Sequence, residues 1–327
     1  PDRRRIHGVY GGCAGGLSVT VTLVTGAAGR LGRSVVRVLA ERGHRVVAVD
    51  RVADPDSPAE QRILDLGDRD ATAALVADVR PDTIVHLAAI AVPFSAPDHE
   101  TYAVNTGLFF SVLDAALAAG TARVLVASSP TVLGYGAPGG WAPQYLPLDE
   151  EHPRAPWNGY AQSKAAVEDL VAMAARQHGD RITVGAFRPC YVIAPEEWHG
   201  APTQQGHTIR ERLDDPPLSA VALFNYVDAR DAGAFVASWA SAPSSATNGL
   251  TFFVGAGDSL VREPVGEALA RLVPSTAPHA AALAPRDPVF TSARAAELIG
   301  WRPERSWRTE LVDNDVPTTD AAEEAHR

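Results

Sequence analysis

Short apolar runs rich in β-branched residues alternate with longer segments in which alanine and leucine recur at helical spacing. The short runs predict buried strands, and the longer segments predict amphipathic helices. The predicted strands are Val19–Thr25, Arg45–Asp50, Arg62–Leu64, Thr83–Leu87, Arg123–Ser128, Ile182–Arg188 and, after a long gap, Leu250–Val254. The predicted helices are Leu31–Arg42, Ala71–Val79, Tyr102–Ala119, Tyr160–His178 and Asp231–Ser241. This alternation predicts an α/β fold with a Rossmann-type, doubly wound parallel sheet.

A glycine-rich segment, Gly26-Ala27-Ala28-Gly29-Arg30-Leu31-Gly32, joins the first predicted strand to the first predicted helix. Strand-to-helix turns also use glycine for steric reasons alone, so the context of the segment matters. Here the glycines let the backbone approach a pyrophosphate, and the amides at the helix start face its oxygens. Asp50 ends the next predicted strand, where a carboxylate accepts hydrogen bonds from both ribose hydroxyls. The pattern therefore predicts a nicotinamide dinucleotide and favours NAD.

Basic residues near this segment leave NADP open as the alternative cofactor. Arg51 or Arg30 would reach a 2′-phosphate if the loop folds toward it, and the competing interpretation is a solvated surface arginine. Asp65, after the third predicted strand, is expected to bind the adenine amino group or to be an exposed loop aspartate.

Tyr160 and Lys164 are four residues apart and therefore share one helix face. A nearby ammonium stabilises phenolate, and moving a tyrosine pKa from ~10 toward ~7 requires about 4 kcal/mol. Lys164 and the positive charge of an oxidised nicotinamide are expected to supply it. The phenolate then takes the proton of a substrate alcohol while hydride leaves its carbon. The Tyr-x-x-x-Lys spacing alone is more often structural, and the glycine segment upstream favours the catalytic interpretation.

Three polar residues in apolar surroundings complete the candidate site. Ser128 and Ser129 end the fifth predicted strand, where a hydroxyl would orient the substrate oxygen against Tyr160 or cap the strand end. Asn105 interrupts an apolar helix, so it is either a buried structural hydrogen-bonding group, which we prefer, or the holder of a water in a proton path.

The pattern divides the chain into four regions. Residues 1–18 are expected to be a disordered extension, because they contain three arginines and a glycine-rich stretch but lack the apolar core of a signal peptide. Residues 19–189 are expected to form the NAD-binding Rossmann domain. Residues 190–312 are expected to form mainly a small substrate-binding region, with one strand at about 250–254 returning to the sheet and a substrate lid or surface insertion at 194–217. Residues 313–327 have the composition of a polar, disordered tail.

Composition narrows the class of protein further. The 327 residues are 46% hydrophobic and 21% charged, which is typical of a globular chain, and the net charge of -10 argues against nucleic-acid binding. Cys13 and Cys190 lie far apart and away from metal-ligand spacing, so neither a disulfide framework nor a metal site is expected. We see no apolar stretch of membrane-spanning length and expect a cytoplasmic protein with a small-molecule substrate and no membrane partner.

The assembled motifs resemble those of the extended short-chain dehydrogenase/reductase family, in particular its NAD-dependent epimerase/dehydratase group. The resemblance covers nearly all of 19–311. Its markers are Thr25 to Gly32, Asp65-Leu66, His86 to Ala89, Ser128-Ser129, Tyr160 to Lys164, Arg188-Pro189, Tyr226-Val227-Asp228 and Leu298 to Pro303. It implies that Ser129, Tyr160 and Lys164 form the catalytic triad. The expected cofactor-binding residues are Gly26, Ala28, Gly29, Arg30, Leu31, Gly32, Asp50, Arg51, Asp65, Leu66, Leu87, Ala88, Ala89, Asn105, Tyr160 and Lys164.

Two departures from the family pattern narrow the expected chemistry. Dehydratases of this group follow the active-site hydroxyl with Asp-Glu, whereas Ser129 is followed by Pro130 and Thr131, so dehydration is not expected. Many nucleotide-sugar epimerases carry Asn two residues after the Arg-Pro pair, where this chain has Tyr191. In this replacement the chain resembles the sugar-acid dehydrogenases of the family.

The leading hypothesis is reversible hydride transfer at a secondary alcohol or ketone of a sugar or nucleotide sugar, by an epimerase or a dehydrogenase. The alternatives are a uronate-type sugar-acid dehydrogenase and a reductase of a non-sugar ketone, with Trp198 in an apolar pocket. A non-catalytic dinucleotide-binding sensor is the alternative from another class. Relatives commonly dimerise through the helices equivalent to Tyr102–Ala119 and Tyr160–His178, so a homodimer is expected.

Overall fold

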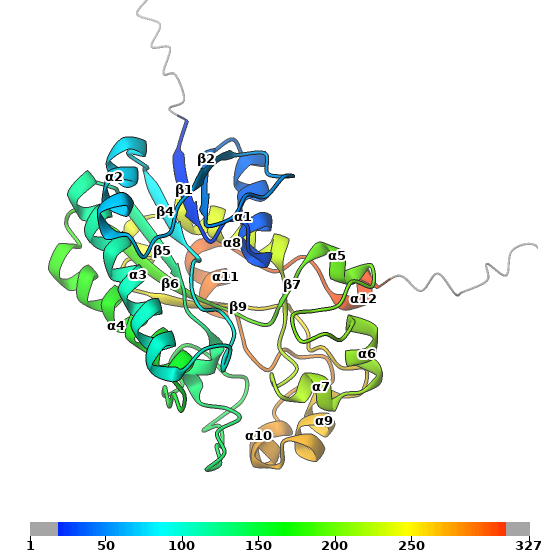
Figure 1. Cartoon of the computed structure of the whole chain (residues 1–327). Helices are drawn as coiled ribbons and strands as arrows, with labels where there is room; N and C mark the ends of the chain where they lie inside the picture. The colour runs from blue at the N-terminus through cyan, green and yellow to red at the C-terminus, as the bar shows by residue number, and fades with distance from the viewer. Residues whose placement is uncertain (1–18, 312–327) are drawn as a thin grey trace, which may run out of the picture.

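Seven parallel strands form the central sheet, in the order β3-β2-β1-β4-β5-β6-β9 (Figure 1). The structure, a computed structural model, describes residues 19–311, and the predicted extension and tail lie outside this range. The strands are β1 (Val21–Thr25), β2 (Arg45–Asp50), β3 (Glu60–Ile63), β4 (Thr83–His86), β5 (Arg123–Ala127), β6 (Thr183–Pro189) and β9 (Thr251–Val254). The predicted Rossmann-type fold is thus confirmed. Each predicted strand is present, with ends shifted by at most two residues.

Helices cover both faces of the sheet, as the doubly wound pattern requires (Figure 1). One layer consists of α2 (Arg69–Val79), α3 (Asp98–Ala119) and α4 (Gly159–His178). The other consists of α1 (Arg30–Glu41) and α8 (Ala229–Ser241), with α11 (Ala293–Ile299) beside β9. Alternate strand residues face opposite layers: Leu23 packs into the core under α3 and α4, and its neighbour Val24 into the core under α1 and α8.

The start of α4 is fixed by local hydrogen bonding and close packing. The Asn158 side chain accepts a hydrogen bond from the backbone N–H of Ala161 at 2.9 Å, which caps the helix. A Cβ at Gly159 would lie 2.6 Å from the Cα of Asp98, so only glycine lets the starts of α3 and α4 approach this closely. These two features place Tyr160 in the first turn of α4, at the carboxyl end of the sheet.

A smaller region follows β6 and is built from short elements. The paired strands β7 (Val192–Ile193) and β8 (Val227–Asp228) form a second sheet, which the sequence pattern did not predict. The short helices are α5 (Pro195–Trp198), α6 (Ile209–Asp214), α7 (Pro217–Ala220), α9 (Val265–Leu272), α10 (Ala277–Ala280) and α12 (Trp307–Glu310). Single turns of 3-10 helix in this part of the chain are η2 (Ser244–Ala246) and η3 (Pro274–Thr276), and a third, η1 (Pro130–Leu133), lies earlier, between β5 and α4.

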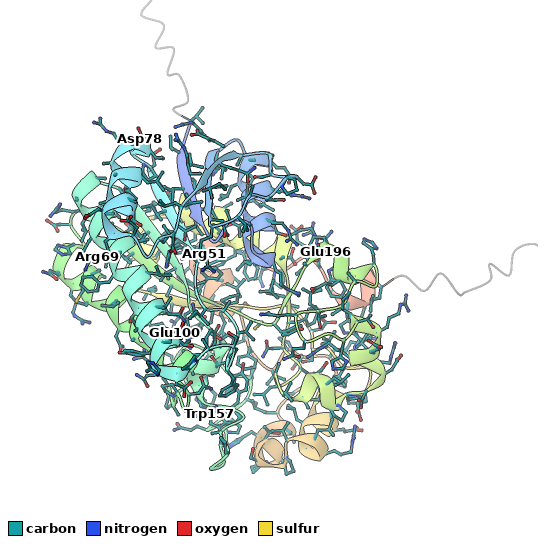
Figure 2. The ribbon with its side chains drawn as sticks, in the orientation of Figure 1. Arg51, Arg69, Asp78, Glu100, Trp157 and Glu196 are labelled. Carbon is teal, nitrogen blue, oxygen red and sulfur yellow. The ribbon has the colours of Figure 1, made fainter. Side chains whose placement is uncertain are left out.

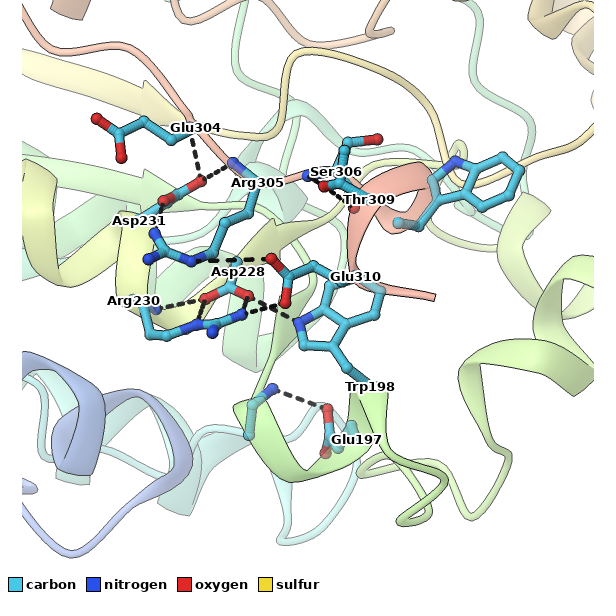
Figure 3. A network of polar contacts seen from close by, with 12 residues as sticks. Glu197, Trp198, Asp228, Arg230, Asp231, Glu304, Arg305, Ser306, Thr309 and Glu310 are labelled. Atoms are coloured by element: carbon cyan, nitrogen blue, oxygen red, sulfur yellow. Dashed lines mark hydrogen bonds and ion pairs between the residues drawn. The ribbon is translucent and has the colours of Figure 1, made fainter. Parts of the chain in front are cut away.

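A network of ion pairs ties this region to the start of α8 (Figure 3). The Asp228 carboxylate accepts hydrogen bonds from Nε1 of Trp198 at 2.7 Å and from the Arg230 guanidinium, which also donates to Glu310 at 2.7 Å. Asp231 accepts from the Arg305 guanidinium at 2.5 Å. The 194–217 segment, which was expected to be a lid or a surface insertion, contains two short helices. The hydrogen bond of Trp198 anchors this segment.

Helix α3 is long and apolar enough, by length and composition, to pass as a membrane-spanning segment, which the sequence analysis did not expect. The same composition is found in core helices of soluble proteins, so this feature is weak evidence for a membrane. In the structure α3 packs between α2 and α4, and Phe109, Val112 and Leu113 are buried against the sheet.

Candidate active site

A cavity of about 1290 Å³ opens at the carboxyl ends of β1, β2 and β4 and continues along the outer surface of α3 and α4. This is the edge at which open α/β sheets bind ligands. Nine of the predicted cofactor residues line it: Gly26, Gly29, Asp50, Arg51, Asp65, Leu66, Leu87, Ala88 and Ala89. Figure 2 shows Arg51 near the centre of the molecule, with Arg69 and Glu100 on the helices beside it. The structure thus brings together residues that lie more than sixty positions apart in the chain.

The glycine segment has the geometry of a phosphate-binding turn. Gly26 has a φ of +69°, and a Cβ at this position would lie 2.6 Å from the backbone nitrogen of Ala88. A Cβ at Gly32 would collide with the carbonyl oxygen of Gly26, so the start of α1 can pack against the turn only with glycine there. The backbone is therefore exposed to a ligand at the amino end of α1, where the helix dipole favours phosphate.

Asp50 and Asp65 both face this cavity but are held differently. Asp50 accepts a hydrogen bond from the backbone N–H of Ala28 at 3.0 Å through one oxygen and from that of Arg51 at 2.7 Å through the other. This pairing fixes a carboxylate at the end of β2 and joins it to the glycine turn. Asp65 accepts from the backbone N–H of Gly67 at 2.9 Å, which leaves its second oxygen toward the cavity.

Three predicted cofactor residues of the glycine segment have other partners. Arg30 forms an ion pair with Glu197 of α5, and its guanidinium also lies 3.4 Å from the carbonyl oxygen of Val192. Leu31 packs against the core between α1 and α8, and Gly32 lies inside the first turn of α1. Arg30 thus links the cofactor turn to the smaller region.

Tyr160 and Lys164 lie on one face of α4, as their spacing predicts. The Lys164 Nζ is 5.8 Å from the centre of the Tyr160 ring and donates a hydrogen bond to the carbonyl oxygen of Ala127 at 2.9 Å. Burial lowers the pKa of Lys164 to about 8. Burial raises the pKa of Tyr160, and a hydrogen bond with Ser129 acts in the opposite direction. In the protein chain alone, burial thus disfavours the phenolate, which was expected to require the positive charges of both Lys164 and an oxidised nicotinamide.

The two serines at the end of β5 have different surroundings. Ser129 lies beside the Tyr160 hydroxyl, and its Oγ also accepts from the hydroxyl of Thr131 at 2.9 Å. Ser128 points away from the site and donates to Glu168 at 2.6 Å. Of the two hydroxyls, that of Ser129 is placed to meet a substrate oxygen next to Tyr160.

Asn105 holds the loop after β4 against α4. Its side-chain oxygen accepts from the backbone N–H of Ile90 at 2.8 Å, and its nitrogen donates to the Ile90 carbonyl at 3.2 Å and to Ser163 Oγ at 2.9 Å. Ser163 in turn donates to the carbonyl of Tyr160 at 2.7 Å. Asn105 is 2% exposed, and these contacts satisfy its side-chain amide within the protein.

Sequence reasoning missed a buried ion pair next to the catalytic helix face. Arg188 donates to both oxygens of Glu168, at 2.8 and 2.9 Å, and Glu168 stands one helical turn after Lys164. The helical spacing from Tyr160 through Lys164 to Glu168 was the available signal. A buried bidentate pair fixes the orientation of the helix face that carries the two candidate catalytic residues.

Four further residues extend the site from Tyr160 into the smaller region. Tyr135 lies close enough to Tyr160 and Cys190 to interact electrostatically with both, and it hydrogen-bonds with the Asn225 side chain. Asn225 accepts from the backbone N–H of Tyr191 at 2.8 Å. Tyr191 carries the guanidinium of Arg212 over its ring, 4.5 Å from the centroid. Only Tyr191 was singled out from the sequence, because the other residues lie outside recognisable motifs.

The sequence matches the NAD dependent epimerase/dehydratase family over residues 22–230. A 2-alkyl-3-oxoalkanoate reductase of Stenotrophomonas maltophilia is 30% identical over 313 residues, which cover 91% of this chain and 86% of the reductase. A UDP-glucose 4-epimerase of Azospirillum brasilense is 31% identical over 169 residues, or 50% of this chain, and the match spans about half (47%) of the epimerase. A short-chain dehydrogenase/reductase superfamily protein from Agrobacterium tumefaciens, solved with bound NAD, has a TM-score of 0.66 at 24% identity and covers 89% of this chain and 94% of its own.

The chain belongs to the NAD-dependent epimerase/dehydratase family of extended short-chain dehydrogenases/reductases. It is an NAD-dependent enzyme of this family, as the resemblance of its motifs predicted. The residues around the cavity fit a dinucleotide, because a turn without side chains at Gly26 and Gly32 and a fixed carboxylate at Asp50 meet at one edge of the sheet.

Proposed function

We propose that the protein catalyses reversible hydride transfer between NAD and a secondary alcohol or ketone of a sugar or sugar derivative. The observation that carries this proposal is the position of Tyr160, buried beside Ser129 and Lys164 on α4, a helix whose Gln162 lines the dinucleotide cavity. Tyr160 is the acid/base, Ser129 orients the substrate oxygen, and Lys164 supplies positive charge.

Each of these side chains has a defined part in the reaction. The Tyr160 phenolate would take the proton of the substrate hydroxyl, and a bound nicotinamide would supply the acceptor for the hydride. Burial raises the pKa of Tyr160, so the phenolate forms only where positive charge compensates it. Lys164 holds such a charge on the same helix face, and its hydrogen bond to Ala127 fixes the ammonium in place.

We assign the cofactor-binding role to the nine expected residues that line the cavity, and NAD as the preferred dinucleotide. Asp50 supports this preference, because both of its oxygens accept backbone N–H groups and its charge would repel a 2′-phosphate. Arg51 also lines the cavity, and it is the residue that would serve NADP. Arg30 reaches the cofactor only if it leaves Glu197.

A second candidate is the reduction of a non-sugar ketone. It is favoured by the similarity to 2-alkyl-3-oxoalkanoate reductase, which extends over 91% of this chain. Epimerisation and uronate-type oxidation stay as further alternatives within the same chemistry. Each of them uses Tyr160 in the same way and differs in whether reduced cofactor leaves the enzyme.

We further propose a homodimer formed through α3 and α4, and a cytoplasmic location as predicted from composition. The outer surface of these helices carries Tyr102 and Phe110, which are 40% and 39% exposed, beside Leu170. Apolar side chains gathered on one surface are typical of a protein interface.

The function is tested by incubating the protein with NAD or NADP and a panel of free sugars, uronic acids, nucleotide sugars and 3-oxo acids. Absorbance of the reduced nicotinamide and chromatography of products separate the outcomes. Net cofactor reduction or oxidation indicates a dehydrogenase or reductase and gives its cofactor preference. An isomerised product without net cofactor change indicates an epimerase.

Replacing Tyr160 tests the assigned role directly. Tyr160→Phe is expected to lower kcat by about 100-fold or more, the range for loss of a general acid/base, with NAD binding retained. The matched control is Tyr145→Phe, which alters a tyrosine that does not line the cavity and donates a hydrogen bond to Asp149 at 2.6 Å. Full turnover in Tyr160→Phe would contradict the mechanism. NAD binding without turnover of any panel member in the unsubstituted protein would favour a sensor instead.

A further inference from the structure

Arg212 of α6 is a buried cation without a carboxylate of its own. The side chain is 1% exposed, and its only hydrogen bond among the described residues runs from Nη1 to Oε1 of Gln205 at 2.6 Å. Its Nε is buried without a partner. A buried charge normally has a counter-charge, because desolvation of an unpaired ion costs several kcal/mol or more.

The carboxylate that interacts electrostatically with Arg212 already has other partners. Glu197 interacts electrostatically with Arg212, but it forms its ion pair with Arg30 and accepts a hydrogen bond from the backbone N–H of Ala194 at 3.0 Å. In Figure 3 the Glu197 side chain lies beside α5, and a dashed line joins it to the backbone at the start of that helix. Two guanidinium groups therefore share one carboxylate, which leaves one positive charge to be balanced.

A second unpaired group lies against the same guanidinium. The Tyr191 ring stacks under Arg212 at 4.5 Å, and the Tyr191 hydroxyl is buried without a hydrogen-bond partner. Both groups can donate a hydrogen bond, and an oxygen anion is the ligand that accepts from a guanidinium and a phenol together.

Contacts connect this pair to the catalytic tyrosine. Tyr191 is bonded through its backbone to Asn225, Asn225 hydrogen-bonds Tyr135, and Tyr135 lies next to Tyr160. A small substrate whose alcohol meets Tyr160 would extend along this path toward Arg212.

We propose that Arg212 and Tyr191 form a subsite for a carboxylate of the substrate, which makes the substrate a small hydroxy or keto acid. This inference rests on the proposed hydride-transfer function. A carboxylate fits better than a phosphate or diphosphate, because it brings a single negative charge, whereas a phosphate brings about two next to the carboxylate of Glu197. Since both donor atoms are buried, the carboxylate enters when α6 moves away from Tyr191.

The test compares charged and neutral probes of similar shape. NAD-loaded Tyr160→Phe protein, which cannot turn the probes over, is titrated by calorimetry with galacturonate, galactose, 3-hydroxybutyrate and UDP-galactose. We expect galacturonate to bind at least tenfold more tightly than galactose. Arg212→Gln should remove that difference and leave galactose binding unchanged, and Arg212→Lys should restore part of it.

Controls separate a lost subsite from a lost fold. Arg37→Gln changes an exposed arginine of α1 and should leave all probes unaffected. Tyr191→Phe removes only the hydroxyl and should weaken galacturonate several-fold, which provides a second measurement if Arg212→Gln does not fold. Hydrogen exchange of residues 205–214 should slow when galacturonate binds, because the ligand holds α6 in place.

Each result decides the proposal. Equal binding of galacturonate and galactose, preference for UDP-galactose, failure of both carboxylates to bind, or an unchanged preference in Arg212→Gln would overturn it. Failure of the proposed function gives a different result from failure of the subsite. Carboxylates would then bind through Arg212, but the unsubstituted protein would turn none of them over. Conversely, turnover of galacturonate that is insensitive to Arg212→Gln would keep the function and reject the subsite.

Discussion

Lys164 is the only lysine in the chain, and every other basic side chain except histidine is arginine. Burial lowers its pKa from 10.5 to about 8. A lysine with a lowered pKa binds its proton less well in the folded than in the unfolded state. The penalty for burying the ammonium is therefore fully present below pH 8 and is relieved as the pH rises from about 8 to 10.5.

The resulting prediction concerns stability as a function of pH. Lys164 should add up to about 3 kcal/mol to the free energy of unfolding between pH 8 and 10.5, at 1.36 kcal/mol per pKa unit. Urea unfolding at several pH values gives the free energy of unfolding of the unsubstituted protein and of Lys164→Met. Only the unsubstituted protein should show this additional increase with pH. Selective ¹³C labelling of lysine gives a single resonance, whose midpoint should lie near pH 8. A midpoint above 10 would show that Lys164 is solvated, contrary to the structure.

At the residue scale, the sequence predicts the residues of local motifs. It does not predict contacts between residues of different elements that the fold brings together. Tyr160 with Lys164, and Gly26 with Asp50, are recognisable because helical spacing or a strand end places them together. Glu168 and Arg188 form a buried pair from two elements, and Arg212 lies in a stretch without clear period. Their importance depends on burial, which one sequence does not report. The presence of a single lysine, Lys164, is a further signal in the sequence.

Strand β6 and helix α8 pack so closely that one position between them must be glycine. A Cβ at Gly185 would lie 2.7 Å from Cζ2 of Trp239, whose side chain is completely buried. Gly185→Ala should therefore destabilise the protein by roughly 1–3 kcal/mol, because neither the ring nor the strand can shift without loss of packing. Urea or thermal unfolding measures the effect.

The matched control for this substitution is Gly139→Ala. No atom lies within 4 Å of a Cβ at Gly139, so its stability should change by less than about 0.5 kcal/mol. If both variants are equally stable, α8 is not packed on β6 as closely as the structure shows.

At the element scale, strong periodicity made the long elements predictable. The buried strands were found because each is a short apolar run rich in β-branched residues, and α3 and α4 because each is a long segment rich in alanine and leucine. Strands β7 and β8 contain two residues each and carry no period, and α5 and α6 lie in a stretch rich in proline and charge. These short elements depend on tertiary contacts such as the Trp198–Asp228 hydrogen bond, which sequence patterns do not contain.

At the scale of the whole molecule, the alternation of strands and helices predicted the doubly wound fold. It did not predict what covers the outer surface of the helices. Helix α3 is more apolar than its buried face requires, and for this reason it also passes the test for a membrane-spanning helix. A second copy of the chain explains the same excess, since Tyr102 and Phe110 remain exposed on the outer surface beside α4. The two explanations predict different behaviour in detergent-free buffer.

Light scattering at micromolar concentration decides between them. We expect a mass of twice 34.5 kDa without detergent, because apolar side chains on α3 and α4 of one protomer would cover those of its partner. Phe110→Glu places a charge in this surface and should give a single-chain mass with an unchanged circular dichroism spectrum. Phe94→Glu is the control, since Phe94 is 65% exposed on a loop outside these helices. A single-chain mass for the unsubstituted protein would reject the dimer, whereas aggregation that only detergent reverses would point to a membrane surface.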